Sequence, residues 1–482
     1  MQKRTELFWL IVLMLTAAGL GFAILTRGHV WGDDFAAYLM QAQSVLDGST
    51  RAFIQRNAFT IDRSSYLLGP VAYPWGYPLL LAPVLAIFGL KALALKAVNV
   101  LFFAGFLLVF QRLARLRLPP VPALLLTAVF AFNPALIQAH DLILTDIPFL
   151  FFSTLAIYLI EKDGEADLRP ASAVAIGAAI YAAFATRTNG VLLLAALATA
   201  QLVRYRGLAE MRKNLTPILL PYLAFGLLYA LGRLLLPEGQ GSYFSHYVLL
   251  TPTVLLQNFF SYLILPAALF ADVPLGSVFG ALLVLGFLRW SFASARRNAA
   301  FLAYILLTLA AFITWPEPQG LRFLYPILPL MLLIVVEGAW SMLKRIPAQR
   351  QPLAQRTGAA LAGALLVLSL VTSARLGWIN LQNGREINGP FDPVSGEMFE
   401  FVREQTAPES VVVFFKPRAL RLFTDRDAFL STTCEGFKGA DYVVLHEKQG
   451  ANGQVANPST CGDVNLKVVF NNLRFTVYQI SQ

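Results

Sequence analysis

Long apolar runs separated by short polar segments dominate the sequence. A bilayer core takes about 20 apolar residues per helix, so runs of this kind predict membrane-spanning helices. Several of the runs are shorter and would extend into their flanking residues. The predicted spans are 7–26, 92–111, 121–138, 147–160, 172–186, 190–203, 215–236, 276–291, 299–314, 323–343 and 357–376. The pattern therefore predicts a polytopic α-helical membrane protein with about eleven transmembrane helices.

Three further stretches predict helices outside these spans. Residues 34–47 and 77–89 fall in a long first loop and predict two helices at the membrane interface. Residues 254–270 are apolar enough to span, but a crossing there would move the basic segment "RWSFASARRN" to the outside. Cytoplasmic loops carry the excess of Lys and Arg, so we expect 254–270 to lie on the outer surface. A pair of additional spans would raise the number to thirteen.

Loop charge sets the expected orientation. With a cytoplasmic N-terminus, the inside segments hold most Lys and Arg, as in Arg112, Arg115, Lys344 and Arg345. The outside loops before the C-terminal part hold fewer over a greater length, which agrees with the positive-inside rule. The first apolar run is long for a signal peptide and no clean A-x-A site follows it, so we expect a retained anchor. An odd number of spans then places the C-terminal part outside.

The C-terminal part has a different pattern. "ESVVVFFKPRALRLFTDRDAFL", "ADYVVLHE" and "VNLKVVFNNLRFTVYQI" predict short strands with turns and one helix between them. We therefore expect two domains, a membrane domain over 1–376 and an extracytoplasmic α/β domain over 377–482. Both cysteines, Cys434 and Cys461, lie in the second domain. They could form a disulfide outside the cytoplasm or remain free thiols, and the spacing leaves both readings open.

Composition supports a membrane protein. Of the 482 residues, 57% are hydrophobic and 14% are charged, whereas soluble domains are about 25% charged. The net charge of +10 could indicate nucleic acid binding, but most of it sits in the short loops that set membrane orientation. We expect membrane lipids as partners and no nucleic acid.

Acidic residues follow the membrane boundary at two outside positions. Asp33 and Asp34 come shortly after the first span, and Asp141 and Asp146 lie between the third and fourth. A carboxylate that lipid partly desolvates gains proton affinity and can act as a general base. Asp34 also fits a helix N-cap, and Asp146 fits the first turn of a helix with the following proline. Because these acids share one face, we expect an active site there.

Two arginines are expected at the same face. Arg187 lies between the fifth and sixth spans, and Arg322 lies at the start of the tenth. A guanidinium group can form two parallel hydrogen bonds to a phosphate. An arginine at this depth can instead extend its charged end to the membrane interface without binding a ligand. Candidate substrate contacts on this side are Tyr38, Tyr73, His140, His246 and Tyr325. The histidines lack zinc-ligand spacing, and no Walker, dinucleotide or nucleophile-elbow motif occurs.

Five segments together resemble a known family. "GDDFAAYLMQAQSVLDG", "YPWGYPLLLAPVLAIFGL", "LTDIPFLFFSTLAIYL", "RTNGVLLL" and "GLRFLYPILPLMLL" occur in the order seen in bacterial family 39-type glycosyltransferases. These are GT-C enzymes related to protein O-mannosyltransferases and lipid A aminoarabinose transferases. The resemblance covers roughly residues 5–345.

The resemblance implies an inverting transfer on the extracytoplasmic face of a bacterial inner membrane. The donor would be a sugar on polyprenyl phosphate, and the acceptor a lipid, glycan or protein. Asp34 takes the base role, with Tyr38 and Gln43 at the family's offsets, and Asp33 is the fallback. Asp146 matches the second acid and Arg322 the arginine on the phosphate side.

Some positions depart from the family. Gln43 stands where Arg is frequent, Phe35 stands where Glu often follows the Asp, and "YPWGYP" replaces the lysine-bearing element. The metal ligands of the aminoarabinose subgroup are not evident. No cofactor is therefore expected, and a divalent metal stays open.

Two other classes of protein remain as alternatives. A transporter or lipid-linked sugar flippase would place charges and broken helices near the bilayer midplane, often in repeated halves. Here the predicted spans are nearly free of ionisable groups and no repeat is detected. An assembly or sensor protein would bind its partner through the C-terminal domain alone.

Overall fold

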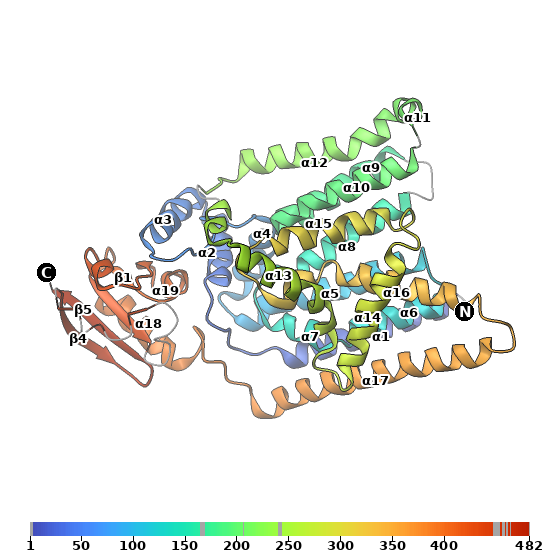
Figure 1. The fold of residues 1–482 in the computed structure, drawn as a ribbon. Helices are drawn as coiled ribbons and strands as arrows, with labels where there is room; N and C mark the ends of the chain where they lie inside the picture. The colour runs from blue at the N-terminus through green and yellow to red at the C-terminus, as the bar shows by residue number, and fades with distance from the viewer. Residues whose placement is uncertain are drawn as a thin grey trace.

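A helical bundle carries a small α/β domain at one end, as the computed structural model in Figure 1 shows. The structure describes residues 3–163, 169–205, 207–239, 243–446, 454–455, 458, 461–462 and 464–481. The N-terminus lies at the end of the bundle opposite the C-terminal domain (Figure 1). The protein is thus a polytopic α-helical membrane protein with a small C-terminal sheet domain.

Each of the eleven predicted spans coincides with a helix or with a bent pair of helices. These elements are α1 (Lys3–Ile24), α5 (Ala92–Arg115), α6 (Pro120–Ala131) with α7 (Pro134–Gln138), α8 (Asp146–Asp163), α9 (Pro170–Thr186), α10 (Leu192–Arg204), α12 (Leu215–Leu235), α14 (Gly276–Ser291), α15 (Ala299–Ile313), α16 (Leu328–Leu343) and α17 (Gln351–Asn383). A short helix, α11 (Leu208–Lys213), precedes α12. In the described part of the chain, five helices are long and apolar enough to cross a membrane, or six if α6 and its bent continuation count as one.

Proline and asparagine set the break between α6 and α7. The two helices meet at 48°, and α7 begins with Pro134 directly after Asn133. The Asn133 side chain accepts from the Leu136 N–H and donates to the Leu269 carbonyl at 2.8 Å. The amide therefore satisfies backbone groups that the bend leaves without helical partners.

The segment at 254–270 is helical, as α13 (Pro252–Ile264) and the 3-10 helix η4 (Leu265–Phe270). It is also long and apolar enough to cross a membrane. Its side chains Leu256, Phe260 and Ile264 are exposed. Exposed apolar side chains of this kind suit lipid contact both for a helix on the outer surface and for a span, so its placement on the surface stays a prediction.

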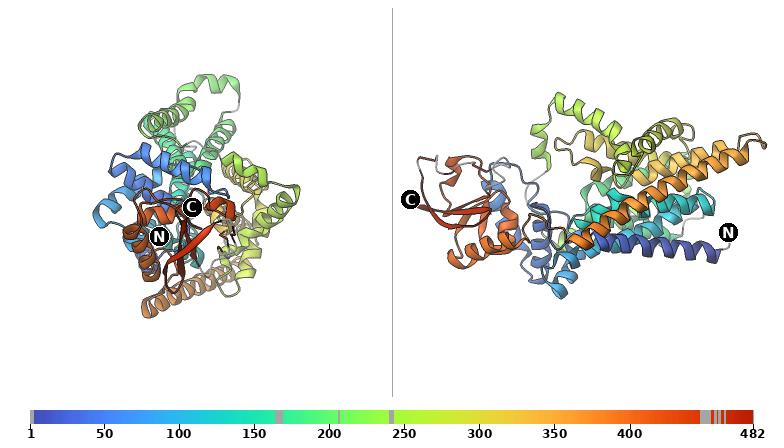
Figure 2. Two further views of the ribbon diagram at one scale, coloured as in Figure 1. Left: turned by 90° about the vertical axis from the view of Figure 1, so that its left-hand side faces the viewer. Right: turned by 90° about the horizontal axis from the view of Figure 1, so that it is seen from below.

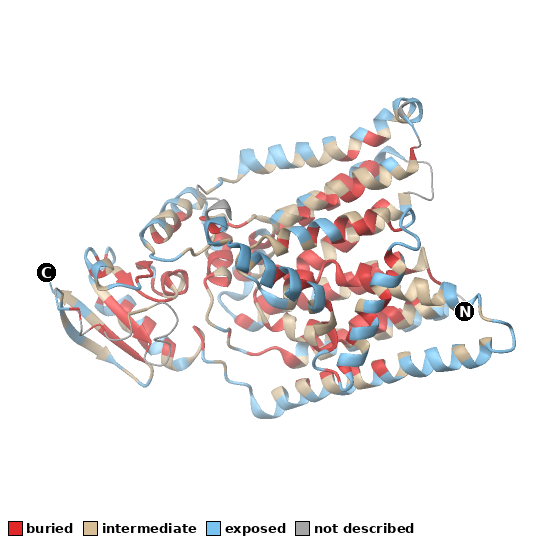
Figure 3. Ribbon diagram, in the orientation of Figure 1, coloured by how far each residue is buried: buried red, intermediate tan, exposed pale blue. Residues whose placement is uncertain are grey.

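The bundle has an apolar interior and an apolar exterior. Large side chains such as Phe103, Phe106 and Phe130 are fully buried between helices. In Figure 3 the buried residues fill the centre, whereas α12 and α17 are largely exposed. On α12 the exposed residues include Leu223, Leu227 and Leu234. A soluble surface would rarely present such a continuous apolar face, so this face is expected to contact lipid.

The first loop forms three helices between the bundle and the C-terminal domain. These are α2 (Asp34–Leu46), α3 (Thr50–Arg63) and α4 (Gly76–Phe88). The positions of α2 and α4 agree with the predicted interfacial helices, whereas α3 was not predicted. The three helices lie between the two parts of the molecule in Figure 1.

The C-terminal domain contains a five-stranded mixed sheet in the order β2-β1-β3-β5-β4. The strands are β1 (Val411–Val413), β2 (Asp427–Phe429), β3 (Tyr442–His446), β4 (Asn465–Asn471) and β5 (Phe475–Ser481), and the helices are α18 (Pro393–Gln405) and α19 (Pro417–Thr424). β1 pairs in parallel with β2 and β3, whereas β5 runs antiparallel to β3 and β4. Because β1, α19 and β2 follow one another, α19 is the crossover helix of a parallel unit.

α17 connects the bundle to this domain without a break until Asn383. The right-hand view of Figure 2 shows it running beside α1. Near its end, Asn380 donates to the carbonyls of Ala23 and Leu25. The predicted boundary at 376 therefore falls inside this helix, and the division into 1–376 and 377–482 stays a prediction.

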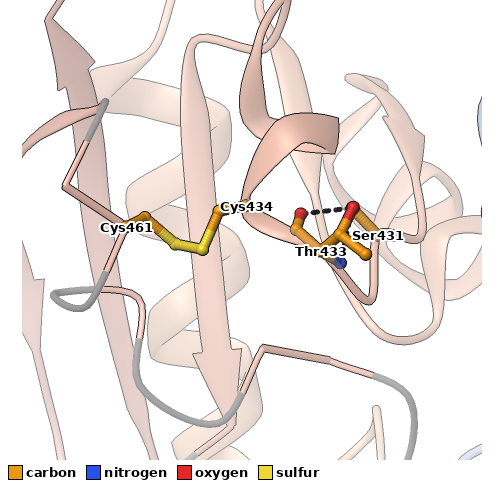
Figure 4. Close-up of a disulfide and its surroundings, with 4 residues drawn as sticks. All are labelled: Ser431, Thr433, Cys434 and Cys461. Atoms are coloured by element: carbon orange, nitrogen blue, oxygen red, sulfur yellow. Dashed lines mark hydrogen bonds between the residues drawn. A yellow bond between two sulfur atoms is a disulfide. The ribbon is translucent and has the colours of Figure 1, made fainter.

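Cys434 and Cys461 form a disulfide in the C-terminal domain, as Figure 4 shows. Their Cα atoms are 5.4 Å apart across 27 residues of sequence. Beside Cys434, the Ser431 hydroxyl donates to the Thr433 carbonyl at 2.8 Å (Figure 4). In the chain-entropy model a loop of this length stabilises a fold by about 3 kcal/mol.

Candidate active site

Asp34 is the first residue of α2, which follows the connection from the end of α1 at Ile24. Its Oδ1 accepts a hydrogen bond of 2.6 Å from the Tyr73 hydroxyl. Tyr73 lies in the irregular segment between α3 and α4, and Asp34 is half-buried. The hydroxyl therefore holds one carboxylate oxygen in a defined direction.

The backbone of Tyr73 is held by the α2 residue Gln41. The Gln41 amide donates to the Tyr73 carbonyl at 2.9 Å and accepts from the Tyr73 N–H at 3.1 Å. The Tyr73 ring also packs against Tyr38 of α2, with centroids 4.7 Å apart. Tyr38 in turn contacts Tyr77 of α4 edge to face at 5.2 Å. Three tyrosines thus connect α2, the loop and α4.

Asp33 has a different environment from its neighbour. It is 7% exposed, and its Oδ1 accepts from the backbone N–H of Arg418 at the start of α19. Its Oδ2 lies 4.0 Å from Lys416 Nζ. Burial raises the pKa of Asp33, although Lys416 and Arg418 act in the opposite direction. Asp33 thus accepts a hydrogen bond from the first turn of α19, and the base role of Asp34 stays a prediction.

A second group of charges surrounds Asp146 at the start of α8. Arg187 Nη1 lies 2.5 Å from Asp146 Oδ1, and Arg322 Nε lies 3.7 Å from Oδ2. The Phe323 ring lies under both guanidinium groups, with its centroid 4.9 Å from Arg187 Cζ and 6.0 Å from Arg322 Cζ. Two guanidinium groups against one carboxylate leave the cluster with a surplus positive charge.

Arg322 retains a donor in this cluster. Its Nε is buried and has no hydrogen-bond partner among the residues that the structure describes. Asp146 itself is only 5% exposed. A buried donor without a hydrogen-bond partner is costly, so an anionic group beside Arg322 would supply the hydrogen bond that Asp146, at 3.7 Å, does not make.

Tyr77 is a fully buried tyrosine of α4 that packs against the Asp34 group. Burial raises the pKa of the Tyr77 hydroxyl, and the negative charge of Asp146 raises it further. The Tyr77 ring contacts Tyr38 of the Asp34 group. Tyr73 of the Asp34 group and Arg187 of the Asp146 cluster line the same cavity, which places both groups at the same end of the bundle.

A cavity of about 1,050 Å³ borders one residue of each group, and Asp34, Asp146 and Arg322 are not among the described residues that line it. It lies between α4, α9, the 3-10 helix η2 (Thr188–Val191), α12 and the end of α15. Its wall includes Tyr73 of the Asp34 group and Arg187 of the Asp146 group, and otherwise is largely apolar and aromatic, with Trp75, Phe184, Trp315 and Phe323. The charged residues in the wall are Arg187, Arg233 and Glu238, and the last two pair with each other. An apolar wall with few charged groups suits a ligand with an apolar chain and an anionic head.

The remaining candidate contacts are placed differently. His246 stacks on Trp315 of the cavity wall, with centroids 5.1 Å apart, and its Nδ1 lies 3.3 Å from a Glu317 oxygen. His140 is fully buried against Phe103, and Tyr325 is buried with its hydroxyl donating to the Ala135 carbonyl. Of the five predicted contacts, only Tyr73 is among the described residues that line the cavity. Substrate contact by Tyr38, His140, His246 and Tyr325 stays a prediction without support from the cavity lining.

Sequence reasoning missed residues that hold the site together. Tyr77 is one, and the repeated Tyr-Pro pair in "YPWGYP" places it four residues after Tyr73, which was a usable signal. The contact between Arg418 and Asn57 of α3 could not be predicted, because neither residue lies in a segment whose pattern links it to the membrane boundary. Asp141 was predicted as an outside acid, but it pairs with the fully buried Lys96 at 2.6 Å.

In the described ranges, no three His, Cys, Asp or Glu side chains gather as a metal site would require.

Comparisons with known proteins identify the fold. No family model and no curated protein matches the sequence. Among solved structures, ArnT from Cupriavidus metallidurans bound to undecaprenyl phosphate is similar, with a TM-score of 0.60 and 12% identity over 98% of each chain.

An archaeal enzyme is similar as well. The Archaeoglobus fulgidus oligosaccharyltransferase in its apo form has a TM-score of 0.61 and 12% identity, over 100% of this chain and 75% of that one. Its complex with an inhibitory peptide and a dolichol-phosphate has a TM-score of 0.57. The chain therefore has the GT-C fold that these membrane glycosyltransferases share.

Proposed function

We propose that the protein is a membrane glycosyltransferase that moves a sugar from polyprenyl phosphate to an acceptor outside the cytoplasm. The observation that carries this proposal is the Asp146–Arg187–Arg322 cluster beside a largely apolar cavity. The same fold is found in ArnT bound to undecaprenyl phosphate and in an oligosaccharyltransferase bound to a dolichol-phosphate. A polyprenyl chain would occupy the cavity and its phosphate would meet the arginines.

Arg187 and Arg322 would stabilise the phosphate that leaves. Charge builds up on the bridging oxygen as the bond from phosphate to the anomeric carbon breaks. Guanidinium groups that Asp146 and Phe323 already hold in place need little reorganisation to meet this charge. Removing one such preorganised donor from an enzyme typically costs about 3 kcal/mol of transition-state stabilisation.

Asp34 would act as the general base. The acceptor hydroxyl attacks the anomeric carbon, its proton passes to Asp34, and the lipid phosphate leaves with the bonding electrons. A single displacement of this kind inverts the anomeric configuration. The hydrogen bond from Tyr73 limits rotation of the carboxylate, which would keep its other oxygen available for the proton of the acceptor hydroxyl.

Replacement of the base tests this assignment. Purified protein in lipid nanodiscs is incubated with labelled undecaprenyl-phosphate sugars, and loss of sugar from the lipid is measured together with product formation. We expect Asp34→Asn to lower the rate by about 10²- to 10⁴-fold, the range that a general base supplies. The matched control is Asp62→Asn, because Asp62 is an exposed acid of the same first loop. Full activity of Asp34→Asn would remove the base role from this residue.

A transporter or flippase of lipid-linked sugars is the alternative that the sequence left open. The buried charges within the described part of the chain favour the transferase, because they gather at the ends of the bundle. Arg117 pairs with Glu161 and Glu337, and Lys96 pairs with Asp141. The same assay separates the two functions: a flippase moves the intact lipid across a vesicle membrane and leaves its sugar attached.

We also propose the orientation that the loop charges predict. The N-terminus lies in the cytoplasm, and the C-terminal domain lies outside, on the side of Asp34 and Asp146. The disulfide supports this orientation, since disulfides persist mainly in oxidising compartments.

A further inference from the structure

Arg418 reaches from the C-terminal domain into the first loop of the membrane domain. It belongs to α19, and it is 0% exposed. Its Nε donates to the Asn57 side chain of α3 at 3.1 Å. Its two terminal nitrogens donate to the carbonyls of Leu68 at 3.0 Å and Pro70 at 2.6 Å. One guanidinium thus ties α3 to the segment that precedes Tyr73.

The helix that carries Arg418 is fixed at both faces. Its N-terminus is capped by Asp33 through the Arg418 N–H at 3.1 Å. Ala419 packs in the apolar cluster of α2 and α4 that includes Phe35 and Tyr73. Leu420 packs instead in the core of the C-terminal domain. α19 is therefore shared between the two parts of the molecule.

Arg418 also touches the residue that holds the proposed base. Its Nη1 lies 3.4 Å from the Tyr73 hydroxyl, and its Cζ lies 5.6 Å from the centre of the Tyr73 ring. The same hydroxyl donates to Asp34 at 2.6 Å. The segment from Leu67 to Trp75 contains no helix or strand, so its position depends on side-chain contacts of this kind.

We propose that Arg418 is a positioning residue, by which the C-terminal domain holds Tyr73 and thereby Asp34 in the orientation that transfer requires. This inference rests on the proposed function. It assigns a role to the C-terminal domain, which supplies part of the active site rather than a separate module. A planar guanidinium with several donors can bridge Asn57, Leu68 and Pro70 at once, whereas a lysine ammonium cannot reproduce this fork.

The chain offers a matched control in the same domain. Arg426 is also buried, and it donates to the Thr406 hydroxyl and to the carbonyls of Thr424, Arg403 and Thr406. All of these acceptors lie within the C-terminal domain. Replacing Arg426 therefore removes a comparable set of buried hydrogen bonds from the domain and does not touch the contact between Arg418 and Tyr73.

Transfer activity is compared for wild type, Arg418→Lys and Arg426→Lys at equal amounts of folded protein. We expect Arg418→Lys to lower kcat by up to about 100-fold, as misplacement of a catalytic group does, with little change in KM for the donor. Arg426→Lys should keep the wild-type kcat. Equal losses of kcat in Arg418→Lys and Arg426→Lys would overturn this inference. The proposed function would still stand in that case, because it rests on transfer by the wild-type protein.

A double-mutant cycle asks whether Arg418 acts through Tyr73. Tyr73→Phe removes the hydroxyl that binds Asp34, so Arg418→Lys should add little further loss in that background. Losses that multiply in full would show that the two residues act separately and would overturn the inference.

A measurement without turnover tests the same contact if no transfer is found in the wild type. Backbone hydrogen exchange is followed in residues 64–76 and at the start of α2. Arg418→Lys should speed exchange in these segments, and Arg426→Lys should leave it unchanged. Unchanged exchange in Arg418→Lys would overturn the positioning role, whatever the protein catalyses.

Discussion

At the scale of single residues, the surroundings of each carboxylate determine its role. Asp33 and Asp34 are adjacent, yet one caps α19 and the other binds a tyrosine hydroxyl. Asp141 and Asp146 show the same contrast, since the first pairs with a buried lysine and the second with two arginines near a cavity. Residue type alone could not separate these roles, because a carboxylate can cap, pair or accept a proton.

His29 leads to a prediction about pH. Its Nδ1–H donates to the Val30 carbonyl at 2.7 Å, and its Nε2 accepts from the Ile143 N–H at 2.9 Å. Burial lowers the pKa of His29 to about 4. The unfolded chain therefore takes up a proton at a higher pH than the folded one. The free energy of unfolding should fall as the pH drops from about 6.5 to about 4, by on the order of 3 kcal/mol from this residue.

Comparison of the wild type with His29→Gln measures this contribution. The glutamine oxygen can still accept from Ile143, but it does not titrate. We expect the melting temperature of the wild type to fall more steeply between pH 6.5 and pH 4.5 than that of the variant. Parallel curves over this range would contradict the assignment.

At the scale of elements, close packing of helix ends positions the charged groups. α4 begins at Gly76, and a Cβ there would come within 2.5 Å of the Ala185 carbonyl oxygen near the end of α9. This contact sets Tyr77 beside the segment that carries Arg187. The sequence predicted both helices, but the approach of one helix start to another helix end leaves no periodic pattern.

Gly76→Ala tests the importance of this approach. Backbone atoms on the α9 side cannot move aside cheaply, so we expect α4 to shift and transfer to fall by about tenfold or more. Gly226→Ala in α12 is the control, since nothing lies within 4 Å of a Cβ at that position. Initial rates and melting temperatures of the two variants are measured together. Similar rates for both would argue against tight coupling between α4 and α9.

At the scale of the whole molecule, the two ends of the bundle differ in their chemistry. One end carries the first-loop helices, the proposed site and the disulfide-containing domain. The other end carries the N-terminus and Arg117, whose guanidinium is buried against Glu161 and Glu337. Concentration of basic residues at that end agrees with a cytoplasmic face.

Labelling of single cysteines tests this orientation. Arg350→Cys and Glu409→Cys each introduce a thiol at an exposed position, before α17 and before β1 respectively. Because the native cysteines form a disulfide, the new thiol is the reactive one. A membrane-impermeant maleimide on intact cells should label Glu409→Cys and reach Arg350→Cys only after lysis. The opposite pattern would reverse the topology.

The periodic features of this protein followed from the sequence by itself. The apolar runs predicted the helices of the bundle, and the C-terminal segments predicted the strands, because hydrophobic length and alternation are local properties. The motif order also led to the GT-C fold, which the comparison with solved structures confirmed. α3 escaped prediction because its stretch is too polar to produce a distinct apolar run.

Only the tertiary structure decided which charged groups meet. Arg418 contacts Tyr73 across 345 residues of chain, and Arg187 contacts Asp146 across 41. A buried charge needs a partner, but the sequence alone does not say which residue is that partner. That choice depends on how the helices pack and where the C-terminal domain comes to rest, so it appears only when the chain is folded.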